Sequence, residues 1–156
     1  MYTLVLLLHS WLRWGVLLFG AASLLFSMLG WLGRRPFTRR DRALQLAFVS
    51  LLDLQLLLGL ALYVVLSPLV PHNGPDFKTA MHVAPLRFFA VEHLAVMLVA
   101  VVIAHVSSVL ARKAPDDTTR HRRWALGLIS TFLLVMIGIP WAGLTYGRPN
   151  FRAWQL

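Results

Sequence analysis

Three ionisable side chains lie in a stretch of the chain that is otherwise apolar enough to cross a membrane. The stretch runs from Ala90 to Ala111 and contains Glu92, His93 and His105. It is about 20 residues long, which at roughly 1.5 Å per helical residue spans a hydrocarbon core of about 30 Å. A charge at that depth costs roughly 2.5 kcal/mol or more, so each of these residues should face protein, water or a bound group. They are therefore the first candidates for a functional site.

Two further polar residues near the start of the chain lie on a stripe of mostly small side chains. Positions 9, 13, 16, 20, 23, 27 and 30 alternate steps of four and three, and they begin with His9 and Arg13 and continue with glycine and serine. His93 lies on a similar stripe at positions 90, 93, 97, 100, 104, 107 and 111. Small residues at this period let helices approach closely in lipid. We therefore expect the first and third spans to pack through these stripes, with His9 and His93 pointing into the bundle.

Two histidines that face each other near one membrane surface have the donor set of a bis-histidine haem b. In that interpretation His9 and His93 bind the iron, and Arg13 or Arg87 binds a haem propionate. Glu92 is expected to form an ion pair with Arg13. The alternative is that this pair only locks two helices together.

A second polar cluster is predicted in the inner half of the spans. It consists of Asp53 and Gln55 in the second span and His105 and Ser107 in the third. Asp53 and His105 differ little in depth, so a hydrogen-bonded pair is expected. A carboxylate and an imidazole inside a membrane also suggest a proton path or a site for a quinone head group. A satisfied polar contact between two helices is the preferred interpretation.

The remaining histidines limit what the chain can bind. A metal site between His72 and His82 is conceivable, although solvated loop histidines are the preferred interpretation. The second and fourth spans are predicted to hold no histidine, so two bis-histidine haems are excluded for this chain alone. A metal other than haem iron is an alternative ligand for His9, His93, Glu92 and the loop residue His82, although no spacing here is diagnostic of one. The absence of cysteine excludes disulfides, iron–sulfur clusters and covalent haem attachment.

Composition determines the expected architecture. Of the 156 residues, 58% are hydrophobic and 13% are charged, which is too apolar for an ordinary soluble domain. The apolar runs predict helices over about 3–32, 43–67, 85–111 and 118–144. The first run has no basic leading region and no small-residue cleavage site, so we interpret it as a retained helix. The chain is therefore expected to be a single all-α domain, an integral membrane four-helix bundle.

The positive charge predicts the orientation of this bundle. Ten of the 15 lysines and arginines fall in two short loops, at positions 34–42 and 112–123. By the positive-inside rule this end is cytoplasmic, so the N- and C-termini are expected outside. The net charge of +9 then reflects contact with anionic headgroups of the lipid bilayer, and nucleic acid is not an expected partner.

Four motifs in this order resemble a group of small four-helix bacterial inner-membrane proteins, sometimes labelled cytochrome b-like. The motifs are HSWLRW at positions 9–14, LQ at 54–55 followed by Gly59 and Tyr63, RF at 87–88 followed by EH at 92–93, and GIPW at 138–141. The similarity covers nearly the whole chain and implies the fold more strongly than it implies haem. Relatives often have histidine at position 53, where this chain has Asp53, so a ligand from the second span is not implied. A looser likeness to cytochrome b561 and copper-resistance D modules is an analogy of fold.

These observations predict a membrane electron-transfer subunit without enzymatic chemistry of its own. It is expected to hold one haem b near the outer face of the bacterial inner membrane and to meet a redox partner or a larger membrane complex. One alternative is a haem-free structural or accessory subunit. The other is a small ion or metal transporter that uses Asp53 and His105, which ranks last because the chain shows no broken helix or internal repeat.

Overall fold

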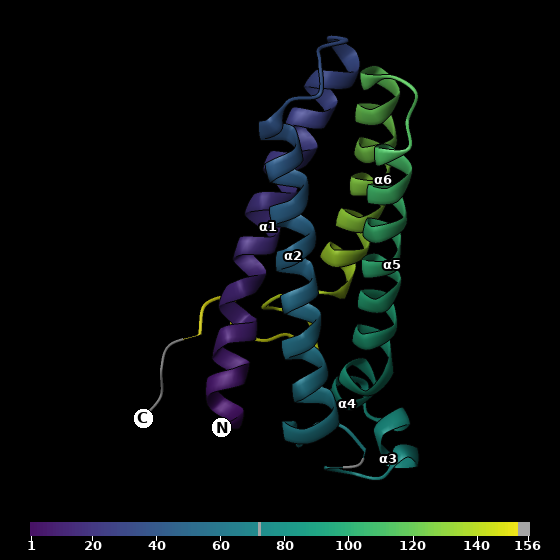
Figure 1. The fold of residues 1–156 in the computed structure, drawn as a ribbon. Helices are drawn as coiled ribbons and strands as arrows, with labels where there is room; N and C mark the ends of the chain where they lie inside the picture. Colours follow the sequence, from purple (N-terminus) through teal and green to yellow (C-terminus); the bar gives the residue numbers. More distant parts are fainter. Residues whose placement is uncertain (72, 153–156) are drawn as a thin grey trace.

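The structure is a computed structural model that describes residues 1–71 and 73–152, and within these ranges the regular structure is entirely helical. Four long helices run side by side (Figure 1). They are α1 (Tyr2–Leu32), α2 (Arg39–Ala61), α5 (His93–Arg112) and α6 (Asp117–Gly138). A π-helical turn, η1 (Leu62–Leu66), extends α2, while α3 (Phe77–His82), α4 (Ala84–Arg87) and the π-helical turn η2 (Phe88–Glu92) lead into α5. The expected all-helical class is thus confirmed.

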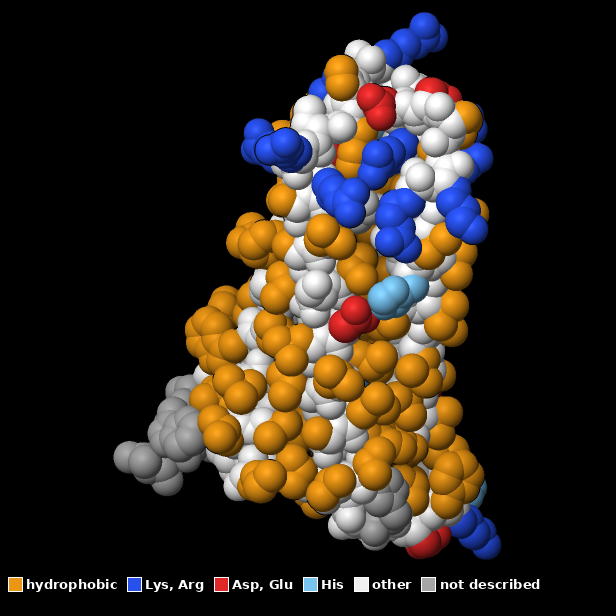
Figure 2. All heavy atoms as spheres, viewed as in Figure 1, with side chains coloured by type: hydrophobic (Ala, Val, Ile, Leu, Met, Phe, Trp, Pro, Cys, Tyr) orange, Lys and Arg blue, Asp and Glu red, His pale blue; other side chains and the backbone are white. Residues whose placement is uncertain are grey.

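Three of these helical stretches are long and apolar enough to cross a membrane. They are Tyr2–Leu32, Arg39–Leu66 and Ala84–Arg112. Hydrophobic side chains cover most of the face shown in Figure 2, whereas lysines and arginines gather mainly at one end. The α1–α2 and α5–α6 connections both lie at that end (Figure 1), as the sequence predicted for the two basic loops.

Side-chain caps fix where two helices begin. Thr38 accepts a hydrogen bond from the Asp41 backbone N–H, and the Asp41 carboxylate accepts one from the Thr38 backbone N–H, so Thr38 is the N-cap of α2. This cap starts α2 at Arg39, four residues before the expected position. The second of these helices is α6. Asp116 is the cap, and its carboxylate accepts a hydrogen bond of 2.8 Å from the Thr119 N–H.

The fourth long helix ends earlier than expected, at Gly138 rather than near position 144. Pro140 has no N–H to donate and disfavours helical backbone at the preceding residue. Ile139 accordingly has an extended conformation, with ψ of 129°. The chain beyond it runs back to the first helix, where the Asn150 carbonyl accepts hydrogen bonds from Arg13 and Trp14. The end of α6 therefore leaves space in the half of the bundle that is remote from the arginine-rich end.

The predicted stripes of small residues are buried, but they do not pack against each other. The α1 stripe from Arg13 to Gly30 is buried, as are Ala100, Ala104, Ser107 and Ala111 of α5. Both stripes face α6, which contacts α1 on one side and α5 on the other. Small residues make room there for large ones: the fully buried Trp124 donates a 2.9 Å hydrogen bond from Nε1 to Ser23 Oγ. The prediction that the first and third spans meet along these stripes is therefore wrong.

Candidate functional site

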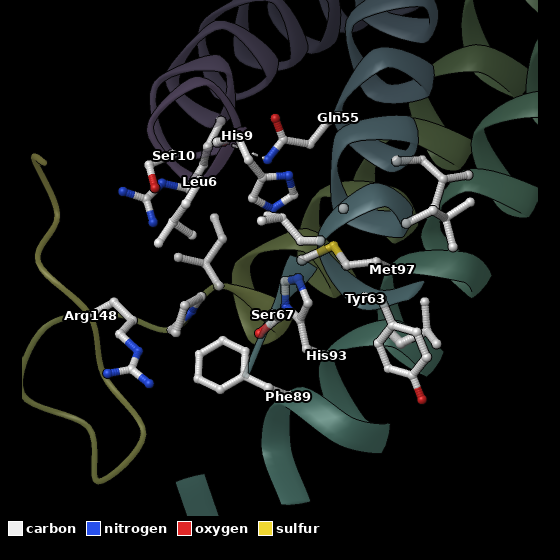
Figure 3. A pocket seen from close by; sticks show the side chains of 18 of the residues that line it. Leu6, His9, Ser10, Gln55, Tyr63, Ser67, Phe89, His93, Met97 and Arg148 are labelled. Atoms are coloured by element: carbon white, nitrogen blue, oxygen red, sulfur yellow. Dashed lines mark hydrogen bonds between the residues drawn. The ribbon is translucent and has the colours of Figure 1, made fainter. Parts of the chain in front are cut away.

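A cavity of about 360 Å³ opens beyond the end of α6, between α1, α2 and the start of α5. His9 projects into it from α1 and His93 from the first residue of α5 (Figure 3). The two ring centroids are 6.3 Å apart, and the ring planes are inclined at 71°. Because α6 stops at Gly138, the two histidines approach each other across the bundle even though their helices are separated along most of their length.

His93 is held in one orientation by the end of α6. Its Nδ1 lies 2.7 Å from the carbonyl oxygen of Gly138, one of the last carbonyls of the helix, which lack a partner within the helix. A carbonyl oxygen can only accept, so Nδ1 carries a proton, and in the neutral ring Nε2 then has the lone pair. No described residue forms a hydrogen bond with Nε2. Histidines that bind metals commonly donate their other ring N–H to a backbone carbonyl in this way.

His9 is positioned through its backbone and leaves its ring nitrogens free. Gln55 Nε2 donates a 2.9 Å hydrogen bond to the His9 carbonyl oxygen. The ring packs on Gly59, where an added Cβ would come within 3.1 Å of His9 Cε1. Nδ1 is buried without a partner in the described part of the chain. A buried polar atom without a partner costs roughly 1–3 kcal/mol, so a ligand that binds this ring would remove a penalty.

The cavity is also lined by cationic side chains. Arg13, Arg148 and Arg152 contribute to its wall, and the described lining contains no aspartate or glutamate. Arg13 is 8% exposed and donates from Nη2 to the Asn150 carbonyl oxygen at 2.6 Å, whereas its Nε has no partner among the described residues. The site therefore combines two histidines, a mostly apolar wall and positive charge.

The expected ion pair between Arg13 and Glu92 is not formed. Glu92 instead accepts a 2.7 Å hydrogen bond from Arg87 Nε, and both side chains are nearly half exposed. Glu92 is about 100° round the helix from His93, so it turns outwards when His93 turns inwards. The π-helical turn η2 aligns residues five apart, which places Arg87 beside Glu92 and away from the cavity lining.

The second predicted cluster divides into separate contacts. The expected Asp53–His105 pair is confirmed, with 2.7 Å between Asp53 Oδ1 and His105 Nε2. The pair lies on the outside of the helix bundle, where both side chains are exposed. Gln55 points the other way, towards His9. Ser107 is buried against Gly127 of α6. The four residues therefore do not share one site.

The histidines outside these clusters have different surroundings. His72 lies outside the described residues, and His82 is exposed. The described residues contain no group of three or more histidine, cysteine, aspartate or glutamate side chains that could hold a metal ion. The expectation that the fourth helix lacks histidine is wrong, because α6 begins at Asp117 and contains His121. This fully buried ring packs against Gly30 and Phe37 at the arginine-rich end.

Fold and site together define an all-helical protein with apolar helices of membrane-spanning length and a cavity lined by two histidines. In comparisons with known proteins, no family model, no curated protein and no solved structure matches the chain.

Proposed function

We propose that the protein is a four-helix membrane subunit that binds one b-type haem between His9 and His93 and takes part in electron transfer. The observation that carries this proposal is the pair of inward-facing imidazole rings, of which His93 is already oriented by Gly138. Bound haem would supply one-electron oxidation and reduction. The residues of the chain would bind it, orient it and exclude water from it.

The donor set and the space around it agree with such a ligand. His9 and His93 would hold the haem iron from two different helices, and their ring centroids lie 6.3 Å apart. The cavity of about 360 Å³ lies within the range of roughly 300–1,000 Å³ for ligand pockets. Its mostly apolar wall, which includes Met97 and Leu94, suits a hydrophobic macrocycle.

The arginines suit the two carboxylates of haem. A buried guanidinium without an acidic partner is costly, and a carboxylate ligand would offset that cost with charge-assisted hydrogen bonds. Arg13 keeps the role expected from the sequence. Arg148 and Arg152 line the same cavity and take the place of Arg87, which is paired with Glu92 on the surface.

In this proposal α6 is the fourth span, although its apolar part from Trp124 to Gly138 is short. About 15 residues at roughly 1.5 Å each reach about 22 Å, less than the hydrocarbon thickness. The irregular chain after Gly138 would cross the remaining part of the hydrocarbon core. Irregular backbone at membrane depth is tolerated where it lines a cavity. The arginine-rich end faces the cytoplasm, so the two termini and the histidine cavity lie near the outer face of a bacterial inner membrane.

A haem-free accessory subunit is the second candidate, and the same His93 contact favours it. The bond to Gly138 joins the start of α5 to the end of α6, which would fix the packing of the outer half without any ligand. A transporter that uses Asp53 and His105 is less favoured, because that pair lies on the outer surface and does not line the cavity.

An absorbance measurement separates these candidates. The protein is purified from membranes in detergent, with haem supplied during expression, and a reduced minus oxidised spectrum is recorded. We expect a b-type band that His9→Ala and His93→Ala each abolish, because each removes a histidine that would hold the haem. His105→Ala is the matched control and should keep the band. A colourless preparation with full helical content would contradict the haem proposal and favour the accessory role.

A further inference from the structure

The Asp53–His105 pair occupies an unusual place for ionisable side chains. It joins α2 to α5 on the outside of the bundle, and the side chains of Asp53 and His105 are 43% and 50% exposed. Figure 2 shows an acidic and a histidine side chain in contact, with hydrophobic side chains on one side of them and lysine or arginine side chains on the other. The pair is therefore not enclosed by the helices of its own chain.

Its depth makes this exposure costly in a lipid bilayer. Asp53 is about 11 residues from Arg42 and His105 about 7 from Arg112, which puts the pair roughly 10–16 Å from the arginine-rich end. That is near the middle of a hydrocarbon core of about 30 Å. Ionisable residues at such depth normally face protein or water, so a protein surface is expected to cover this pair.

The surroundings of the pair have the shape of a helix-packing surface. Among the outward-facing positions of α2 and of α5, one series on each helix follows steps of four, three and four residues, and the ionisable residue takes the third place in it. The two series are Leu46, Ser50, Asp53 and Leu57, and Leu98, Val102, His105 and Val109. This spacing matches the seam of left-handed helix pairs.

The hydrogen-bonding capacity of the pair identifies the partner. The bond uses Asp53 Oδ1 and His105 Nε2, and no described residue bonds Asp53 Oδ2 or His105 Nδ1. Where His105 carries a proton on both ring nitrogens, one acceptor and one donor are left side by side at the same depth. A two-fold axis along the membrane normal keeps every residue at its own depth, so a second copy would present a matching donor and acceptor.

We propose that the chain forms a parallel two-fold dimer through the outer face of α2 and α5. In it, Nδ1–H of each protonated His105 donates to Oδ2 of Asp53 of the partner subunit. The two carboxylates and two imidazolium groups then form a closed ring with no net charge. Leucine and valine side chains on either side of the ring complete the interface.

Cysteine cross-linking in native membranes tests the location of this interface. The chain has no cysteine of its own, so a single introduced thiol reports one position. Oxidation is expected to give a disulfide-linked dimer for Ser50→Cys and Leu57→Cys. The matched control is Leu18→Cys, which replaces a residue of α1 that is 67% exposed, and this variant should stay monomeric. Equal yields at position 18, or cross-links to a different protein instead of a second copy, would overturn the proposal.

Exchange of the residues at positions 53 and 105 tests the closed ring of carboxylates and imidazolium groups. Dimerisation is measured in bilayers by single-molecule photobleaching. Asp53→Asn and His105→Asn are each expected to weaken dimerisation at least about tenfold, since two interhelical hydrogen bonds are lost. Asp53→His combined with His105→Asp should restore it. Monomeric wild-type protein at all densities, or single variants that dimerise like the wild type, would refute the proposal. Neither measurement depends on bound haem, so they stand apart from the test of the histidine cavity.

Discussion

The contact between α5 and α6 at Gly127 gives a sharp test of the packing described above. A Cβ at position 127 would lie 2.1 Å from Ser107 Cβ and 2.0 Å from Ser107 Oγ. Carbon atoms pack at about 3.5–4.0 Å, so Gly127→Ala requires the two helices to separate by more than 1 Å. Rotation of the serine cannot relieve the clash, because its Cβ is fixed to the backbone.

The expected cost follows from two opposing effects. Overpacking of a close contact costs roughly 1–3 kcal/mol. Alanine is about 1 kcal/mol better than glycine within a helix, which offsets part of this cost. Gly15→Ala is the matched control, because its nearest neighbour, Leu51, would be 3.9 Å from the new Cβ. We therefore expect Gly127→Ala to lower the free energy of unfolding by up to about 2 kcal/mol relative to wild type, and Gly15→Ala to raise it or leave it unchanged.

Removal of the opposing side chain should rescue the variant. Ser107 Cα is 3.6 Å from the added Cβ, an ordinary contact distance, so Ser107→Gly combined with Gly127→Ala recreates the space. Reversible unfolding in detergent, followed by helical circular dichroism, measures all four proteins of this double-mutant cycle. If Gly127→Ala is as stable as Gly15→Ala, or if Ser107→Gly brings no rescue, the reasoning from close helix packing is wrong.

Two further predictions concern the hydrogen bonds that hold the helices in place. Trp124→Phe removes the Nε1 donor of a buried hydrogen bond to Ser23 Oγ, so the free energy of unfolding should fall by about 1–3 kcal/mol. The double variant with Ser23→Ala should lose less stability than the sum of the losses of the two single variants. Simple additivity of the two losses would contradict the hydrogen bond. Hydrogen bonds from the Thr119 backbone N–H and hydroxyl lower the pKa of Asp116, so the stability that this cap contributes is present above the ordinary pKa of aspartate and is lost as the pH falls through the lowered value. Asp116→Asn keeps a cap that does not titrate, so its unfolding should lose that part of the pH dependence, and unchanged acid sensitivity in chemical denaturation would argue against it.

The histidine cavity and the Asp53–His105 pair on the surface have different structural origins. The cavity exists because a proline ends α6 early, which exposes the Gly138 carbonyl to His93 and opens the space that His9 enters. The surface pair exists because α2 and α5 meet with ionisable residues at one depth on their outer side. One feature suits a ligand inside the chain, and the other suits a second copy outside it.

Local patterns in the sequence were sufficient for the helical class, the basic end and several contacts. Hydrophobic length predicted apolar helices, alternating steps of three and four predicted which faces of α1 and α5 are buried, and equal depth predicted the Asp53–His105 bond. Thr38 was predictable as a cap because a capping box is a pattern of four neighbouring residues. These properties depend on short stretches of chain, which the sequence displays directly.

The neighbour of each buried face was decided by the tertiary structure. A stripe of small residues shows that some helix approaches closely, but the large side chains of α6, such as Trp124, determine that it is α6 and not the opposite stripe. In the same way, the end of α6 lies level with the start of α5, so the Gly138 carbonyl oxygen meets His93. The π-helical turn before α5 places Glu92 beside Arg87, and the two side chains form a hydrogen bond. Side-chain direction follows from sequence within one helix, whereas partners across helices depend on the packing of the whole bundle.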